Sequence, residues 1–163
     1  IVKGLEKYGR FDLARQFAIR HLFFLLEGAS PEDGGSGSLW EAYAPFSPEP
    51  AKWPKKGPHP RENFIPYAGL CTISLMIENV IGFYISLPRK TIDWIIPTLE
   101  GMGIENLLLK RNMIKIVSNQ SGRGWEIRLE SEKLYYFTIN ILGRKKRTLP
   151  IPSGKCSILL DKL

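Results

Sequence analysis

One segment of the 163-residue chain places a carboxylate between two aromatic side chains. The segment runs from Leu39 to Pro45 (LWEAYAP) and follows a glycine-rich approach. Sugars present apolar C–H faces and polar rims, so a sugar site combines flat aromatic platforms with a few fixed carboxylates and amides. Glu41, between Trp40 and Tyr43, has that chemistry. We take Glu41 as the candidate catalytic residue, with a structural or idle loop glutamate as the alternative. The two aromatic residues are candidates for substrate binding, with core packing as their competing explanation.

Other reaction chemistries have little support in the sequence. His21 and His59 are the only histidines, and neither has a Cys, Asp or Glu at ligand spacing, so no metal site is predicted. The glycines between 34 and 37 lack the Lys-Ser/Thr of a phosphate loop, and no Gly-x-Ser-x-Gly motif occurs. Cys71 and Cys156 have neither redox-type nor metal-type spacing. We therefore expect no cofactor.

The candidate loop lies between helical segments. Residues 1–8 are typical of the end of a helix that begins earlier, stopped by a left-handed Gly9. A second helix is predicted from Phe11 to about Glu27, because apolar residues recur at helical spacing there. The loop of about residues 29–66 holds most of the prolines and five aromatic residues, which favours a loop folded against something. The alternative is that its Pro-rich stretch, Pro45 to Pro60, is a linker.

The next stretch, Tyr67 to Leu87, is apolar and long enough to be weighed as a transmembrane helix. Glu78 lies near its middle, where a carboxylate costs about 2.5–3.5 kcal/mol on insertion scales. Gly69 and Gly82 also lower its helix propensity. We therefore expect a buried helix of a soluble helical protein, with Glu78 facing a partner or water, and no membrane span.

After Pro88 the apolar pattern becomes strand-like. Short β-type runs separated by turn signals occupy residues 91–95, 104–109, 113–117, 125–129, 134–142 and 156–160. They predict a small antiparallel sheet or half-sandwich. The boundary with the helical part lies near Leu87, which gives two domains, residues 1–87 and 88–163.

The net charge of +7 is concentrated in the second half. Up to Leu87 there are nine Lys and Arg against nine Asp and Glu, and from Pro88 onward fourteen against seven. The densest run, Arg144 to Arg147, is explained by a hairpin tip or a solvated edge strand. It lacks the aromatic interleaving of nucleic-acid-binding sheets, so no nucleic-acid partner is expected. The alternative function is a non-catalytic module whose basic β-sheet binds an acidic polysaccharide or a protein.

Three segments together resemble a known family. Tyr8–Ala14 (YGRFDLA), Leu39–Pro45 and Phe64–Leu70 (FIPYAGL) are similar to the last helix pair of the (α/α)6-toroid glycoside hydrolases, a clan of trehalases, processing α-glucosidase I enzymes and mannosylglycerate hydrolases. Thr91–Trp94 and Gly103–Leu107 resemble the β appendage of some bacterial members. The resemblance implies an α+β fold class: the last helices of an (α/α)6 toroid followed by a small antiparallel β-sheet or half-sandwich appendage.

The resemblance also implies a mechanism. In these families an aromatic-Glu-x-Tyr-x-Pro loop carries the general base of an inverting glycosidase, which makes Glu41 the base. A following Phe-x-x-Trp segment opens the final helix, and Tyr67 stands at that Trp position, so it joins Trp40 and Tyr43 as a substrate-binding candidate. Trp53, Arg61 and Asn63 are further candidates for the pocket. The sequence supports these three less strongly than Glu41, Trp40, Tyr43 and Tyr67.

The general acid of these families is an Asp on an earlier loop, and no residue of this chain matches it. The first residues contain no initiator Met and no targeting signal, so the start looks internal to a longer polypeptide. We therefore expect the upstream remainder of that polypeptide as partner, a glycoside or oligosaccharide as substrate, and no activity of this chain alone. Pro45 is followed by Phe46 to Glu49 instead of the usual Gly, and the Gly-rich Glu-Tyr signature of trehalases is missing, so trehalose is not the favoured substrate.

Overall fold

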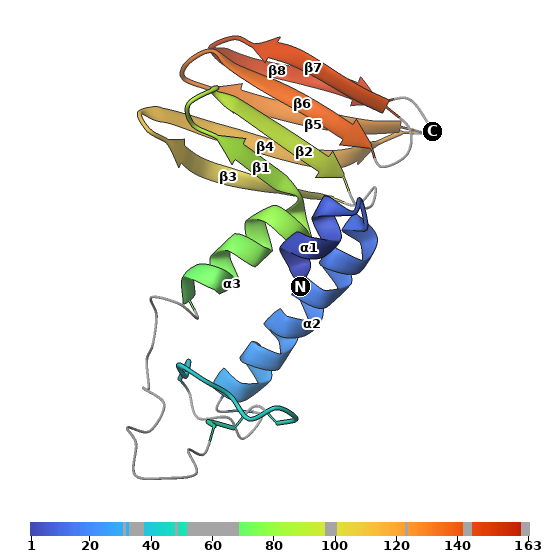
Figure 1. Cartoon of the computed structure of the whole chain (residues 1–163). Helices are drawn as coiled ribbons and strands as arrows, with labels where there is room; N and C mark the ends of the chain where they lie inside the picture. The colour runs from blue at the N-terminus through green and yellow to red at the C-terminus, as the bar shows by residue number, and fades with distance from the viewer. Residues whose placement is uncertain are drawn as a thin grey trace. The chain divides into compact units, whose positions relative to one another are not determined.

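The computed structural model describes residues 1–30, 32, 38–47, 49–51, 69–96, 101–122, 124–141 and 145–160. The chain divides into two compact units, Ile1–Val80 and Ile81–Leu163. The first unit contains helices and the second contains β-strands (Figure 1). Within the described ranges, no helix combines the length and the apolar character needed to cross a membrane.

The helical unit contains α1 (Val2–Lys7), α2 (Phe11–Ala29) and α3 (Leu70–Leu75), which continues as a π-helical segment, η3 (Met76–Ile81). Gly9 follows α1 with φ +71°, and its N–H donates to the Glu6 carbonyl at 2.9 Å. The predicted stop at this glycine is confirmed, because few other residues adopt this conformation without strain. The second predicted helix is also confirmed, and its buried face consists of Ala14, Ala18, Leu22, Leu25 and Gly28.

Large apolar side chains also lie on the outside of these helices. On α2, Phe23 and Leu26 are about three-fifths exposed. Leu70, Ile73 and Met76 are exposed at a spacing of three residues, which places them on one side of α3 and its η3 continuation. Exposed apolar side chains that gather on one side of a helix are typical of a surface that other protein covers.

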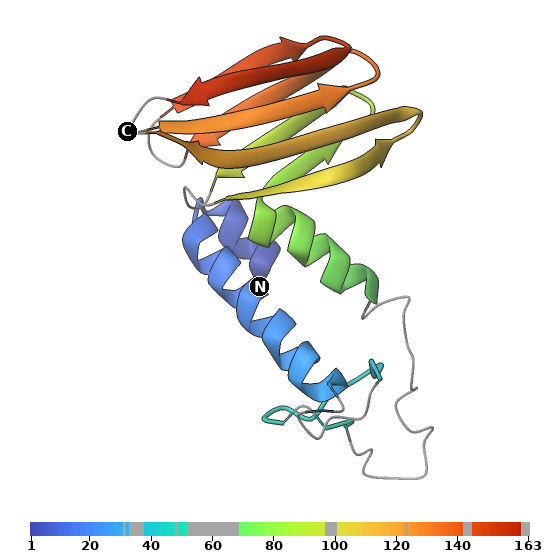
Figure 2. The ribbon, with the colours of Figure 1, turned by 180° about the vertical axis from the view of Figure 1, so that it is seen from behind.

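The second unit is a β-sandwich of eight strands in the described part of the chain. Their order in sequence is β1 (Phe83–Ser86), β2 (Thr91–Ile96), β3 (Met102–Leu109), β4 (Asn112–Ser121), β5 (Gly124–Ser131), β6 (Tyr135–Ile141), β7 (Lys145–Ile151) and β8 (Gly154–Leu160). They form two four-stranded sheets, ordered β1-β2-β6-β7 and β3-β4-β5-β8. The sheets stack face to face, as both views show (Figures 1 and 2). Strands β2 and β6 pair in parallel, whereas the other neighbours are antiparallel.

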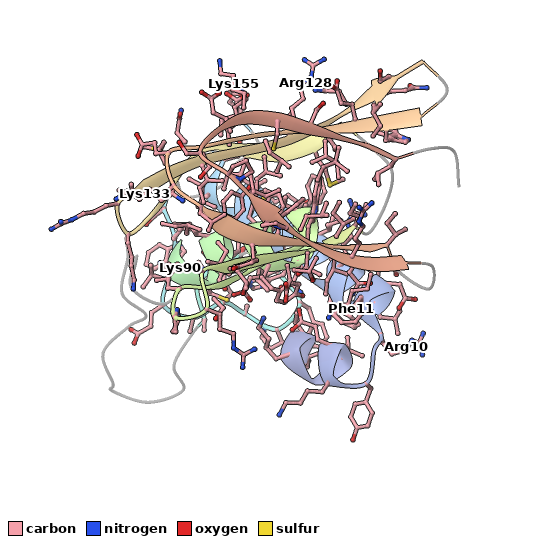
Figure 3. All side chains as sticks on the ribbon, turned by 90° about the horizontal axis from the view of Figure 1, so that it is seen from above. Arg10, Phe11, Lys90, Arg128, Lys133 and Lys155 are labelled. Atoms are coloured by element: carbon pink, nitrogen blue, oxygen red, sulfur yellow. The ribbon has the colours of Figure 1, made fainter. Side chains whose placement is uncertain are left out.

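The core lies between the two sheets, where side chains from both fill the space (Figure 3). Trp94 is fully buried, with its ring centroid 4.9 Å from that of Phe83 and 6.2 Å from that of Phe137. Its indole N–H donates to the Ile81 carbonyl at 2.8 Å, which satisfies the one polar atom of this side chain. The opposite sheet contributes Ile114, Ile116, Ile127 and Leu129.

The predicted fold class is wrong. The sequence led us to expect an α+β chain made of the last helices of an (α/α)6 toroid and a small antiparallel β appendage. The described chain is instead mostly β-sheet, with two four-stranded sheets and helices only at α1, α2 and α3 with η3. The β part is also larger than a half-sandwich, and its first sheet is mixed rather than antiparallel.

Part of the error comes from the apolar stretch between Tyr67 and Leu87, which we interpreted as one buried helix. In the structure its last residues form β1, whose Phe83 is fully buried. An unbroken apolar run is compatible with a buried helix and with a buried strand, so periodicity alone does not separate them. Gly82 marks the change: its φ is +94°, and a Cβ there would lie 2.1 Å from the Ile95 carbonyl oxygen.

Residues 145–147 of the basic run begin β7, and Arg144 lies outside the described residues. The sheet order places β7 at an edge, paired with β6 alone, and Lys146 and Arg147 are exposed. The interpretation of this run as a solvated edge strand is therefore confirmed. Positive charge at such an edge discourages pairing with another sheet.

Candidate active-site loop

The loop that carries Glu41 folds back on itself. Tyr43 and Pro50 form an isolated antiparallel bridge. On either side of it, the Ala44 N–H donates to the Glu49 carbonyl at 2.9 Å and the Ala51 N–H donates to the Ala42 carbonyl at 3.0 Å. These backbone bonds give the candidate residues a defined scaffold rather than an extended linker.

A tight turn within this loop surrounds Glu41. The Trp40 backbone N–H donates to the Tyr43 hydroxyl at 3.0 Å, which closes the turn across the glutamate. The Tyr43 ring packs edge-on against Phe24 of α2, with ring centroids 5.6 Å apart and planes at 71°. Tyr43 therefore fixes the turn and ties it to the helix.

Glu41 itself is exposed at the tip of the turn. Trp40, one residue before it, is partly exposed, so part of this side chain remains accessible to a ligand. The arrangement presents one carboxylate and one aromatic side chain on a scaffold held by Tyr43.

The structure brings three of the four predicted site residues into one turn: Trp40, Glu41 and Tyr43. Tyr67 lies outside the described residues, as do Trp53, Arg61 and Asn63. The sequence did not identify Phe24 as a support for Tyr43. The available signal was its position in the last turns of α2, just before the loop. Across the described ranges, no three or more His, Cys, Asp and Glu side chains gather where they could hold a metal ion.

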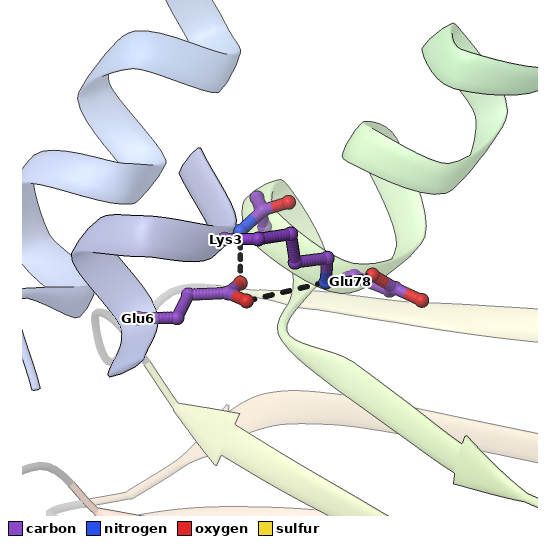
Figure 4. A network of polar contacts seen from close by, with 4 residues as sticks. Lys3, Glu6 and Glu78 are labelled. Atoms are coloured by element: carbon purple, nitrogen blue, oxygen red, sulfur yellow. Dashed lines mark hydrogen bonds and ion pairs between the residues drawn. The ribbon is translucent and has the colours of Figure 1, made fainter. Parts of the chain in front are cut away.

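A second polar cluster in the helical unit joins α1 to η3 (Figure 4). The Lys3 ammonium contacts the carboxylates of Glu6, at 3.2 Å, and Glu78. Asn79 is buried, and its side-chain N–H donates to Glu6 at 2.6 Å. The expectation that Glu78 faces a partner is thus confirmed, and the partner is Lys3. Because these contacts join residues over 70 positions apart, the cluster fixes the start of the unit against its end.

Lys3 gives this cluster a testable pH dependence. Burial disfavours the charged ammonium, but hydrogen bonds to Glu78 and Glu6 and their charges outweigh it, so the pKa of Lys3 is raised. A raised folded-state pKa stabilises the fold below the unfolded value of about 10.5, and this stabilisation is lost as pH rises through the folded-state pKa. We expect Lys3→Met to melt at a lower temperature than the wild type at neutral pH, with the difference shrinking in strong alkali.

Circular dichroism measures the melting temperatures of the wild type and of Lys3→Met from neutral pH to strong alkali. Lys7→Met, which removes an exposed lysine of the same helix, is the matched control and should show no such convergence. A Lys3→Met difference that stays constant with pH would contradict the assignment.

Comparison with known proteins assigns the β-sandwich to a family. Residues 82–163 match the model of the trehalase C-terminal domain. This match covers half of the chain and includes every strand of the β-sandwich. The chain therefore belongs to the trehalase C-terminal domain family, and the expected relation to trehalase-like glycoside hydrolases is confirmed at that level.

One curated relative that matches this chain is a longer protein. An uncharacterized protein of Borreliella burgdorferi is 56% identical over 164 residues, a match that covers all of this chain and 35% of the relative. The chain thus spans about a third of the length of the relative it matches. No solved structure matches the chain significantly.

Proposed function

We propose that this chain is the C-terminal part of a glycoside hydrolase that cleaves glycosidic bonds with inversion, and that Glu41 is its general base. The observation that carries the proposal is the turn in which Tyr43 closes on the Trp40 N–H and presents Glu41 on a fixed scaffold. The family match covers residues 82–163, outside this turn, and supports a glycosidase context for the chain as a whole.

The proposed reaction uses two carboxyl groups on opposite faces of a sugar ring. Glu41 takes a proton from a water molecule as that water attacks the anomeric carbon. The glycosidic C–O bond breaks on the other face, and a carboxylic acid gives its proton to the departing oxygen. The two groups stand about 6.5–9.5 Å apart in such enzymes, because the water must fit between base and sugar.

We place the general acid in further polypeptide of the same protein. The matched relative is about three times as long as this chain, which leaves room for an upstream catalytic segment. The exposed apolar faces of α2 and α3, including Phe23 and Ile73, are surfaces that such polypeptide would cover. The chain alone is then inactive, because protonation of the leaving group is missing.

The aromatic residues take separate roles in this proposal. Trp40 serves as a platform against the apolar face of a sugar ring. Tyr43 is a positioning residue, since its hydroxyl accepts the Trp40 N–H and its ring rests on Phe24. Tyr67 is proposed as a further substrate contact on the strength of the sequence alone.

Stereochemistry tests the proposed reaction class. We expect the full-length protein to release a sugar whose first-formed anomer has the opposite configuration to the bond that was cleaved. Proton NMR during early turnover of a panel of disaccharides, trehalose included, measures this before the anomers equilibrate. The 163-residue chain alone is the control and should release no sugar. Retention of configuration would overturn the assignment of Glu41 as a base.

A further inference from the structure

The turns at one end of the β-sandwich enclose a cavity of about 360 Å³. Three turns contribute cationic side chains to its lining: Lys90 between β1 and β2, Lys110 and Arg111 between β3 and β4, and Lys133 between β5 and β6. None of the lining residues is acidic. Figure 3 shows Lys90 and Lys133 at the same end of the sandwich. The cavity therefore gathers positive charge from segments that are far apart in sequence.

These four cations lack an acidic partner among the described residues. In the part of the chain that the structure describes, none of them forms an ion pair. Other lysines of the same unit do: Lys115 pairs with Glu105 at 2.5 Å, and Lys155 with Glu130 at 3.7 Å. The contrast distinguishes the cavity from the charge-balanced outer face of the second sheet.

The backbone under two of these lysines is strained. Lys90 has φ +52° and Lys110 has φ +59°, a left-handed conformation that glycine or asparagine adopts at lower cost. Among the described residues they are two of the three non-glycine residues with positive φ. Strain of this kind is commonly found at functional sites, where the surrounding structure holds it in place.

Hydrogen bonds hold two of the turns in position. The Lys90 carbonyl accepts from the Tyr136 N–H at 2.9 Å, which fixes the first turn to the start of β6. The buried Asn112 side chain accepts from the Lys133 N–H at 2.9 Å and donates to the Lys133 carbonyl at 3.2 Å. Both lysines thus extend from anchored backbone, which reduces the entropy lost when they bind a ligand.

The rest of the lining is largely apolar, and it includes a buried hydroxyl group that has no hydrogen-bond partner among the described residues. Leu87 and Leu134 line the cavity from two of these turns, and Leu109 lines it from the end of β3. Tyr135 also lines the cavity and is 2% exposed, and its hydroxyl has no hydrogen-bond partner among the described residues. A ligand for this cavity therefore needs concentrated negative charge and a body with apolar faces.

We propose that the cavity binds a small organic phosphate of the size of a phosphorylated monosaccharide. A phosphate monoester carries about −1.5 to −2 charge and three strong acceptor oxygens, which suits several lysine and arginine donors. The volume is within the range of small-molecule sites, about 300–1,000 Å³. The leucine side chains suit the C–H face of the sugar ring. This site is built from different residues than the Glu41 loop and does not depend on hydrolysis.

Calorimetric titration of the whole chain with glucose 6-phosphate tests the proposal, with glucose and inorganic phosphate as separate arms. We expect glucose 6-phosphate to bind more tightly than either arm. The double variant Lys90→Gln/Lys133→Gln should weaken it roughly tenfold or more, since one hydrogen bond to a charged group is worth about that factor. Lys115→Gln/Lys155→Gln removes the same charge from the outer face and should change the Kd by less than about twofold.

Amide chemical shifts provide a second measurement on the unmodified chain, and we expect them to move in the three turns on addition of glucose 6-phosphate. Inorganic phosphate binding as tightly as the sugar phosphate would assign the cavity to free phosphate and overturn the proposal. No binding of glucose 6-phosphate, or equal loss in both double variants, would overturn it as well. None of these results bears on hydrolysis by the full-length protein, so failure here is distinguishable from failure of the proposed function.

Discussion

The full-length protein carrying Glu41→Gln is expected to hydrolyse its glycoside about 10²–10⁴-fold more slowly than the wild type, the usual contribution of general acid–base catalysis. Glutamine keeps the size of the side chain and its ability to hydrogen-bond, but it cannot accept a proton from water. Glu41 is exposed at the tip of its turn, so the amide requires no repacking of a core. The loss should therefore appear in kcat, with KM and the melting temperature close to wild type.

Glu49→Gln is the matched control for this experiment. Glu49 is an exposed glutamate of the same loop, and only its backbone carbonyl takes part in the described hydrogen bond to Ala44. Its replacement should leave kcat within about twofold, as expected of a surface substitution. Steady-state kinetics on the best disaccharide of the panel measures both variants. Equal activity of Glu41→Gln and Glu49→Gln would contradict a catalytic role for Glu41.

Trp94→Ala is expected to lower the free energy of unfolding of the β-sandwich by about 3–5 kcal/mol, the usual cost of removing a buried aromatic side chain. Trp94 has no exposed surface and packs between Phe83 and Phe137. The truncation also leaves the Ile81 carbonyl without its 2.8 Å hydrogen bond, which adds to the cost. Because small domains are stable by only about 5–15 kcal/mol, this one change removes a large part of the margin.

Urea unfolding of the whole chain, followed by circular dichroism in the β-sheet region, measures the effect. Tyr136→Ala on the neighbouring strand β6 is the control, since that ring is 44% exposed and should cost less than about 1 kcal/mol. If both variants unfolded at the same urea concentration, the core would not lie between the two sheets as described.

Local signals predicted the elements better than their assembly. The helix from Phe11 is marked by regular apolar spacing, and its neighbour ends at Gly9, where positive φ favours glycine. Six strands of the β unit coincide with predicted β-type runs. Strand β7 matches no predicted run, because its first residues are basic. Their charges indicate an exposed edge, but the segment lacks the alternation of apolar and polar residues that marks a strand. Strand β1 was not predicted, because it lies at the end of the apolar stretch that was expected to form a helix.

Non-local pairing was beyond the reach of these signals. The parallel pairing of β2 with β6 joins residues about 45 positions apart, such as Ile92 and Phe137, and no turn between them specifies it. Pairing of this kind is decided by which faces can be buried together, not by local pattern. The fold class was wrong for the same reason, because it was inferred from short motifs rather than from the packing of whole elements.

The same limit applies to the sites. The Trp40–Tyr43 turn was predicted because its residues are adjacent in sequence, whereas the support from Phe24 comes from α2. The cationic cavity was not predicted, since its lysines come from three separate turns. Lys90 and Lys133 become neighbours of one cavity only when β2 and β6 pair.

Chemical rescue of a Glu41→Ala variant of the full-length protein tests most directly whether this carboxylate acts on the attacking water. Azide is a nucleophile that needs no base, and the truncated side chain leaves space for it. We predict that sodium azide restores cleavage of a substrate with an activated leaving group and yields a glycosyl azide of inverted configuration, with no such effect in Glu49→Ala. Cleavage that azide does not restore, or a glycosyl azide of retained configuration, would contradict the role assigned to Glu41.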